Sequence, residues 1–324
     1  MSSLLSRRDA LRGLGLLGLG TAAAPAVFAQ PWPIAPRGFD DHGGMATPYY
    51  RAKLGEISLH VFRDAVFEIP AAAFATNVEG TAVQDLLGGY NLPTDIAFTP
   101  VNVLLLETGG ETVLIDTGTG PAEGERGRLF EGLAAVGMDT GAIDKVVISH
   151  FHGDHIGGMV RDGAPSFPNA TYHFPAPEKA FLDSYEPGDN EQANQGVAMA
   201  QSVLQPLMDA GVLQTFEDGT ELAAGVTAKA AHGHTPGHMA FHIASGDEHL
   251  LVTADAANHY IATFEHPEWI FAFDAIPEMT VATRGALYGM AAEDGLKVWG
   301  THLPFPGFGT VIRDGEGFRF ITAA

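Results

Sequence analysis

Short runs of hydrophobic residues alternate with amphipathic stretches from Tyr50 to the end of the chain, and Gly, Asp and Asn separate them. Apolar, β-branched runs between such residues are typical of strands, whereas apolar residues at helical spacing indicate helices. The predicted strands are 112–116, 145–149, 226–231, 249–255 and 296–302, and the predicted helices are 127–136, 194–210 and 277–292. This pattern predicts an α/β fold in which two mixed sheets pack together with helices outside.

An acidic residue or a histidine stands at or just beyond the end of each predicted strand. These residues are Asp116, His150, His234, Asp255 and His302. Loops at strand ends are where layered α/β proteins place their ligands. We therefore expect these side chains to meet at one edge of the fold.

The N-terminus has the three-part layout of an export leader. Arg7 and Arg8 precede the apolar, glycine-rich stretch 13–24, and Ala29 stands where a signal peptidase would cleave. This pattern predicts a twin-arginine leader over 1–29, followed by a linker or N-terminal arm over 30–50 and one folded domain over 51–324. Ala10 departs from the usual leader pattern, so Sec export or a retained anchor are the alternatives. A bacterial periplasmic or secreted protein is the expected result.

Composition narrows the partners and the chemistry. The chain has 324 residues, of which 46% are hydrophobic, enough for one large core. It has no cysteine, so a metal would be held by nitrogen and oxygen ligands. Without the leader, 14 basic and 38 acidic residues remain, a net charge of −24. This charge argues against nucleic acid and favours a small neutral or cationic substrate, and no membrane association is expected after leader cleavage.

The segment 150–155 concentrates metal-ligand chemistry in six residues, with three imidazoles and one carboxylate. Both groups are ready ligands near neutral pH. Residues i and i+2 at a strand end point the same way, so His150 and His152 can bind one ion. Gly153 permits a sharp turn that would direct Asp154 and His155 toward a second position. The spacing therefore predicts two ions rather than one.

This His-x-His-x-Asp-His motif resembles that of the metallo-β-lactamase superfamily. The Val-Leu-Ile-Asp-Thr-Gly stretch at 113–118 and the Gly-His-Thr-Pro-Gly-His stretch at 233–238 lie where that family has them. The resemblance spans about 54 to 320. The tail from Thr301 to Phe320 and the leader are most similar to the methyl parathion hydrolase group, which includes lactonases. The resemblance implies an αββα sandwich with the metal site at the edge between its sheets.

The resemblance also implies a ligand set for two divalent ions. His150, His152 and His234 would hold the first ion, and Asp154, His155 and His302 would hold the second. Asp255 would bridge both ions, with a hydroxide between them, so Asp154 and Asp255 are the predicted catalytic residues. Zinc is the expected metal, although iron, manganese, cobalt or cadmium can fill such sites.

Other polar residues near the motifs have open assignments. His232 lies two residues before His234 and is the alternative ligand. Asp116 and His238 are predicted to orient ligands, with a plain turn residue and simple packing as their alternatives. The remaining histidines of the second half read as ordinary surface or core residues: His242, His249, His259 and His266.

The predicted reaction is metal-assisted hydrolysis by an activated water. The chain has no cysteine and no Gly-x-Ser-x-Gly element, so nothing supports a covalent route. The expected substrates are neutral esters or lactones, extending to phosphotriesters as in the similar group. Segment 258–273 differs from methyl parathion hydrolase, which argues against organophosphates. Aromatic side chains predicted to line the substrate pocket, with core packing as the alternative, are Phe181, Tyr185, Trp269, Phe271 and Phe273.

Several rival functions use the same fold. A β-lactamase or a glyoxalase-II-like thioesterase are the hydrolytic alternatives, and a one-iron persulfide dioxygenase is the non-hydrolytic one. The net charge opposes a nuclease or phosphodiesterase. A dioxygenase would not need His302, and a binding protein would not need seven ligands. The resemblance also allows a homodimer.

Overall fold

The computed structural model describes residues 48–120 and 127–323. The predicted leader and most of the predicted linker therefore lie outside the described residues. The strands are β1 (Tyr49–Leu54), β2 (Ile57–Pro70), β3 (Ile96–Thr108), β4 (Glu111–Ile115), β5 (Lys145–Val147), β6 (Val160–Arg161), β7 (Ala164–Pro165), β8 (Thr171–Pro175), β9 (Leu213–Phe216), β10 (Glu221–Ala223), β11 (Val226–Ala230), β12 (Met239–Ser245), β13 (Glu248–Val252), β14 (Lys297–Trp299), β15 (Phe308–Asp314) and β16 (Gly317–Thr322). The α-helices are α2 (Ala82–Gly89), α3 (Leu129–Ala135), α4 (Gly153–Ile156), α5 (Ala176–Asp183), α6 (Glu191–Asp209), α7 (Ala262–Glu265) and α8 (Pro277–Asp294), with 3₁₀ turns η3 (Ala71–Phe74), η4 (Thr140–Ala142) and η5 (Ala254–Ala256).

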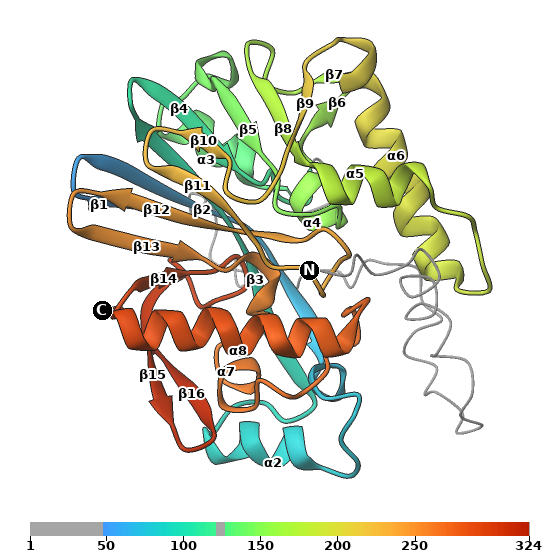
Figure 1. Ribbon diagram of the computed structural model, residues 1–324, viewed down its shortest axis with the longest axis vertical. Coiled ribbons are helices and arrows are strands. Elements are labelled where there is room, and N and C mark those ends of the chain that lie inside the picture. The colour runs from blue at the N-terminus through green and yellow to red at the C-terminus, as the bar shows by residue number, and fades with distance from the viewer. Residues whose placement is uncertain (1–47, 121–126, 324) are drawn as a thin grey trace, which may run out of the picture.

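Two seven-stranded sheets form the centre of the molecule (Figure 1). The first has the order β1-β2-β3-β4-β5-β8-β9 and the second the order β10-β11-β12-β13-β14-β15-β16. Parallel pairing joins β4, β5, β8 and β9 in the first sheet and β13 with β14 in the second. The predicted two mixed sheets and αββα sandwich are confirmed.

Hydrophobic side chains on both faces of the central strands hold the layers together. On β3, Leu104 and Leu106 belong to the core between the two sheets, while Val103 and Leu105 pack in the cluster that includes α3 and α6. The second sheet is covered by α8, whose Leu287 packs with the buried face of β12 to β14. Strands buried on both faces read as continuous apolar runs, which is why the sequence indicated them clearly.

The predicted elements are confirmed with small shifts of their ends. The strand predicted over 249–255 ends as β13 at Val252, and the strand predicted over 296–302 ends as β14 at Trp299. Asp255 and His302 therefore lie in loops beyond the strands. No helix within the described residues is long and apolar enough to span a membrane.

Candidate metal centre

Seven side chains from four segments that follow strands converge at one edge of the sandwich. They form two groups of candidate metal ligands, one of His150, His152, His234 and Asp255 and the other of Asp154, His155 and His302. Within each group, the ligand atoms lie within 4.8 Å of one another. The structure thus brings together all seven residues that the sequence analysis named as ligands.

The first group is arranged around the imidazole of His152. Its Nδ1 lies 3.0 Å from Nε2 of His150 and 3.0 Å from Nε2 of His234. Nε2 of His234 in turn lies 3.2 Å from Oδ2 of Asp255. Three ring nitrogens and one carboxylate oxygen therefore face a common point.

The second group meets the first at Asp255. Nε2 of His302 is 3.5 Å from Oδ2 of Asp154 and 3.1 Å from Oδ2 of Asp255. Nε2 of His155 is 3.6 Å from the same Asp154 oxygen and 3.1 Å from Oδ1 of Asp255. The two oxygens of Asp255 thus face both groups at once.

Gly153 begins the short helix α4. This single helical turn directs Asp154 and His155 toward the second group, the direction expected from the sequence. A Cβ on Gly153 would lie 3.0 Å from the terminal methyl of Met199 on α6. The residue is small here because α6 packs closely against this loop.

Three of the histidines are oriented through their other ring nitrogen. Nδ1 of His155 lies 2.8 Å from Oδ2 of Asp116, and Nδ1 of His234 lies 3.0 Å from Oδ1 of Asp274. Nδ1 of His302 lies 2.8 Å from the carbonyl oxygen of Pro100. Each acceptor fixes the Nδ1–H tautomer, which leaves a lone pair on Nε2 directed into the site.

These lone pairs supply a test of whether a metal fits. The three Nε2 atoms all lie within 3.2 Å of Asp255, itself an acceptor, so with neutral imidazoles and no cation the site would bring lone pairs against lone pairs. Nε2 of His155 and Oδ1 of Asp255 are buried and have no hydrogen-bond partner among the described residues. Buried polar atoms are normally satisfied. The chain's own residues therefore fit a cationic group at this position.

Asp116 links the end of β4 to the metal loop. Its two oxygens accept hydrogen bonds from the backbone N–H and the hydroxyl of Ser149, both at 2.8 Å, in addition to the His155 contact. Its backbone has a φ of +59°, a left-handed conformation that costs roughly 1 kcal/mol for a residue other than glycine. Such strain is held at sites where the side chain must point in one direction.

His238 supports Asp255 through the backbone. Nδ1 of His238 donates to the carbonyl oxygen of Ala231 at 2.8 Å, and its Nε2 accepts the backbone N–H of Asp255 at 3.0 Å. Burial lowers the pKa of His238 to about 3, which keeps it neutral and able to accept. The expected supporting position of His238 is the one that the structure shows.

Glu178, which the sequence analysis did not identify, connects the two histidine-rich loops. Its fully buried carboxylate accepts hydrogen bonds from the Thr235 hydroxyl at 2.6 Å, the Gly237 N–H at 2.5 Å and the Phe151 N–H at 3.2 Å. Burial raises the pKa of Glu178 to about 7, against the lowering effect of these hydrogen bonds. A Cβ on Gly237 would lie 2.3 Å from the Glu178 backbone nitrogen, so only glycine allows this close approach.

The charges at the site balance around Asp255. Burial alone raises the pKa of this carboxyl, but the surrounding imidazoles, led by His302, hold it well below its usual range. Burial also lowers the pKa of His234, yet the charges of Asp255 and Asp274 outweigh it and raise the pKa to about 9. Neighbouring carboxylates, led by Asp255, also outweigh burial at His155 and His302 and raise their pKa values. A metal must displace these protons, so its affinity should rise with pH.

The remaining histidines lie outside the two groups. The ring of half-buried His232 is 3.1 Å from the carbonyl oxygen of His238 through Nδ1, so His234 and not His232 joins the candidate ligands. His242 and His249 stack on each other at 5.1 Å, and His266 stacks on Trp269 at 4.0 Å. His259 is buried and packs against Phe74 at 5.1 Å.

The aromatic residues predicted to line the pocket lie on two sides of the centre. Phe181 stacks between Phe151 and Tyr185, at 5.8 and 5.5 Å, on a ladder that begins beside His152. On the other side, Trp269 and Phe271 are buried in the core cluster around η3 and α2, with Phe273 packed against it. The rings of Phe271 and His234 stack with centroids 6.4 Å apart. Their contact with substrate stays a prediction.

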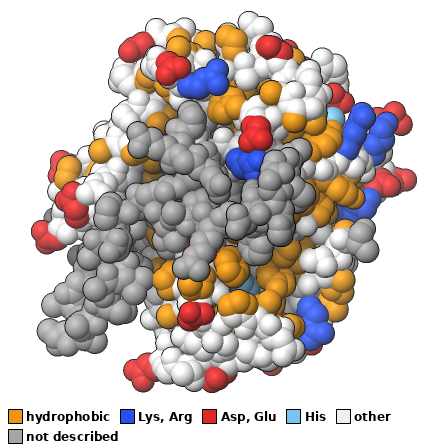
Figure 2. All heavy atoms as spheres, turned by 180° about the vertical axis from the view of Figure 1, so that it is seen from behind, with side chains coloured by type: hydrophobic (Ala, Val, Ile, Leu, Met, Phe, Trp, Pro, Cys, Tyr) orange, Lys and Arg blue, Asp and Glu red, His pale blue; other side chains and the backbone are white. Residues whose placement is uncertain are grey.

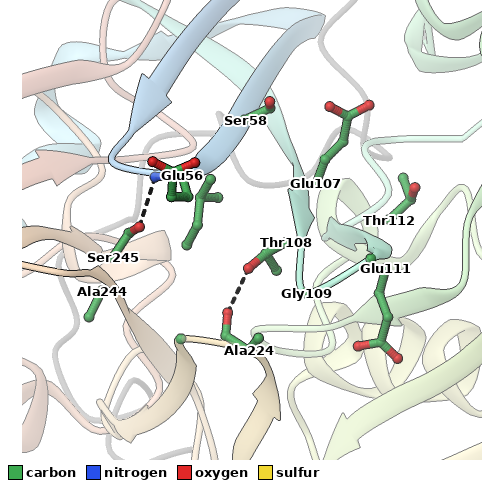
Figure 3. Close-up of a pocket in the computed structure, with 13 residues that line it drawn as sticks. Glu56, Ser58, Glu107, Thr108, Gly109, Glu111, Thr112, Ala224, Ala244 and Ser245 are labelled. Carbon is green, nitrogen blue, oxygen red and sulfur yellow. Dashed lines mark hydrogen bonds between the residues drawn. The ribbon is translucent and has the colours of Figure 1, made fainter.

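A cavity of about 620 Å³ opens at the opposite end of the strands (Figure 3). Turns of both sheets line it, and Glu56, Glu107 and Glu111 supply its charge. None of the seven candidate ligands lines this cavity. The chemistry of the molecule is therefore concentrated at the other edge of the sandwich.

The chain is similar to several solved structures of hydrolases. The chain is similar to AidC, described as a dizinc quorum-quenching lactonase, with 26% identity over 86% of this chain and 98% of that chain and a TM-score of 0.81. It is also similar to AbOPH, described as a hydrolase of the β-lactamase superfamily, with 25% identity over 87% and 99% of the two chains and a TM-score of 0.79.

A more distant similarity extends to AiiA of B. thuringiensis, with 20% identity, 82% and 100% coverage and a TM-score of 0.57, which shows the fold alone. No curated protein sequence matches the chain. The family model described as Metallo-beta-lactamase superfamily matches residues 96–294, which contain six of the seven candidate ligands. The chain belongs to the metallo-β-lactamase superfamily.

Proposed function

We propose that this protein is a binuclear metal-dependent hydrolase of lactones and neutral esters. One observation carries the proposal: three oriented imidazole lone pairs converge on the buried carboxylate of Asp255, between two groups of ligand atoms. In the proposal, His150, His152 and His234 hold one ion and Asp154, His155 and His302 hold the other, with Asp255 between them. Zinc is the proposed metal, by analogy with the dizinc neighbour.

When bound, two divalent ions would supply an activated water and polarise the carbonyl under attack. The chain's residues set up that reaction. Asp255 holds its position through His238 and through the side chain of Asn258, whose amide donates to Oδ2 at 3.2 Å. The Asp154 carboxylate is partly exposed, with 11% of its surface accessible, and can accept the proton of the attacking water and return it to the leaving oxygen.

A neutral lactone or ester is the proposed substrate class. The similarity to AidC supports lactones, and the −22 charge of the chain disfavours anionic substrates. On the face seen in Figure 2, described acidic and basic side chains are scattered around hydrophobic ones and do not gather into a basic patch. We also propose a small neutral substrate rather than nucleic acid. A periplasmic or secreted location, a homodimer and turnover of phosphotriesters are further proposals.

The test is a substrate panel on metal-free and zinc-reconstituted protein. The panel contains an acyl-homoserine lactone, an aryl ester, a phosphotriester, a thioester and a β-lactam. We expect zinc-dependent hydrolysis of the lactone with the largest kcat/KM, and activity that is lost on chelation and restored by zinc. Greater kcat/KM for the thioester or β-lactam would overturn the proposed substrate class, and metal-independent activity would overturn the proposed mechanism.

A further inference from the structure

Arg284 is a fully buried guanidinium on α8, on the outer side of the second sheet. A buried charge of this kind persists only where its donors are satisfied. Nε donates to the carbonyl oxygen of Ala256 at 3.1 Å, and one terminal nitrogen donates to that of Trp269 at 2.6 Å. These two bonds fix the guanidinium between the loops that follow η5 and α7.

The other terminal nitrogen of Arg284 makes two contacts that lead to the metal centre. It donates to Oδ2 of Asp274 at 3.0 Å and to Oδ1 of Asn258 at 3.1 Å. Oδ1 of Asp274 faces Nδ1 of His234 at 3.0 Å, and the amide of Asn258 donates to Oδ2 of Asp255. One intervening side chain thus connects this nitrogen to each of two candidate ligands: Asp274 connects it to His234, and Asn258 connects it to Asp255.

Both contacts restrict the orientation of the intermediate side chain. The Asp274 carboxylate is held by Arg284 and by the Phe271 N–H at 3.0 Å, so only its Oδ1 is directed to His234. The Asn258 amide can donate to Asp255 only if its oxygen faces the other way, and the Arg284 contact requires that orientation. Arg284 therefore determines which hydrogen-bonding face each of these two residues shows to the metal centre.

The second group of ligands shares only Asp255 with this network, because the orientation of its own histidines does not depend on it. His155 is oriented by Asp116 from the first sheet, and His302 by the carbonyl oxygen of Pro100 on β3. Within the described residues, the contacts of Arg284 reach His234 and Asp255 and neither of those two histidines. The dependence is therefore unequal between the two positions.

We infer that Arg284 is a positioning residue that selectively supports the metal position formed by His150, His152 and His234, through Asp274 and Asn258. This inference rests on the proposed function, because it concerns the affinity of one of the two proposed ions. Removing such a supporting residue typically lowers metal affinity about 10- to 100-fold. The proposal predicts that this loss falls mainly on the position that contains His234, since the other position shares only Asp255 with the network.

The experiment measures zinc affinity of each position by competition with a chromophoric chelator. Arg284→Met is made in the His302→Ala background, which keeps the first position, and in the His234→Ala background, which keeps the second. We expect affinity to fall about 10- to 100-fold in the first background and to stay within about twofold in the second. Equal losses in both backgrounds, or no loss in the first, would overturn the inference.

Asp274→Asn keeps the shape of the side chain and carries the same test if Arg284→Met does not fold, as judged by circular dichroism. It removes the ion pair with Arg284 and weakens the acceptor for His234. The expected selective loss is the same, and a loss at both positions or at neither would count against the inference. If the wild-type chain itself binds no zinc, the proposed function fails first, so the two failures are distinguishable.

Discussion

The two halves of the metal centre are built in different ways. The half from the first sheet places four candidate ligands, His150 to His155, on one loop that runs into α4. The half from the second sheet brings His234, Asp255 and His302 from three separate loops, and α8 supports it from outside through Arg284. The first half is local in sequence and the second depends on packing of the whole second sheet. Variants in each half, and in the Asp255 carboxylate that joins the halves, can test this difference.

Replacing Asp255 should have the largest effect, because its two oxygens face both groups. We expect Asp255→Ala to lower kcat/KM by roughly a thousandfold or more, since several kcal/mol of metal-dependent stabilisation are lost. Steady-state kinetics with lactone substrate measures this. Retention of wild-type kcat/KM and of two ions per chain would contradict the shared role.

Removing one ligand from each of the two ligand groups should abolish one ion each. His302→Ala and His234→Ala are expected to retain about one zinc per chain instead of two, because each leaves the other group with its own ligands. Elemental analysis of the dialysed variants measures this. His232→Ala is the matched control, since His232 faces a backbone carbonyl and not the ligands. Loss of an ion in that control would indicate that His232, the alternative to His234, is a metal ligand.

Glu178→Ala should destabilise the link between the halves. It leaves the donors of Thr235, Gly237 and Phe151 without their buried acceptor. We expect the free energy of unfolding to fall by about 3 kcal/mol, measured with urea on the metal-free chain. Glu268→Ala, at a 60% exposed carboxylate, is the control and should change stability by less than about 0.5 kcal/mol. Equal effects of the two variants would exclude this role of Glu178.

Asp116→Ala should weaken mainly the second metal position, which contains His155. The substitution removes the acceptor that orients His155, so the affinity of the second position for zinc should fall about 10- to 100-fold. Zinc titration against a competing chelator measures both positions separately. An equal loss of zinc affinity at the first position, which contains His234, would show that the two metal positions do not respond separately.

The pH dependence of the metal-free chain gives the smallest predicted effect. The folded-state pKa of His234 is raised to about 9 from an ordinary value of 6.5. The stabilisation it provides is therefore fully present below pH 6.5 and lost as the pH rises to about 9. The raised pKa values of His155, His302 and Glu178 act in the same direction, whereas His238 and Asp255 have lowered pKa values and do not titrate in this interval.

Urea unfolding of the metal-free chain between pH 6.5 and 9 should show this loss, and His234→Ala should reduce it. With zinc bound the trend should reverse, because metal replaces the protons. A metal-free chain whose stability is the same at both ends of the interval would contradict the account of His234.

The difference between the halves also explains what the sequence could predict. The strand at 112–116 was predictable because Val113 and Leu114 are both buried, on opposite faces, and the ligands on 150–155 were predictable because their spacing is local. His234, Asp255 and His302 were assigned through the family resemblance. Glu178, Asp274 and Arg284 were missed because their partners lie 10 to 59 residues away. Only the packed structure brings such side chains into contact.

The central claim is that Asp255 joins two metal positions in one centre. The most direct test is to count zinc per chain in the purified protein by elemental analysis, while lactone hydrolysis is followed as zinc is added to the metal-free form. The account predicts full activity only at two zinc ions per chain. Full activity at one ion per chain would contradict it.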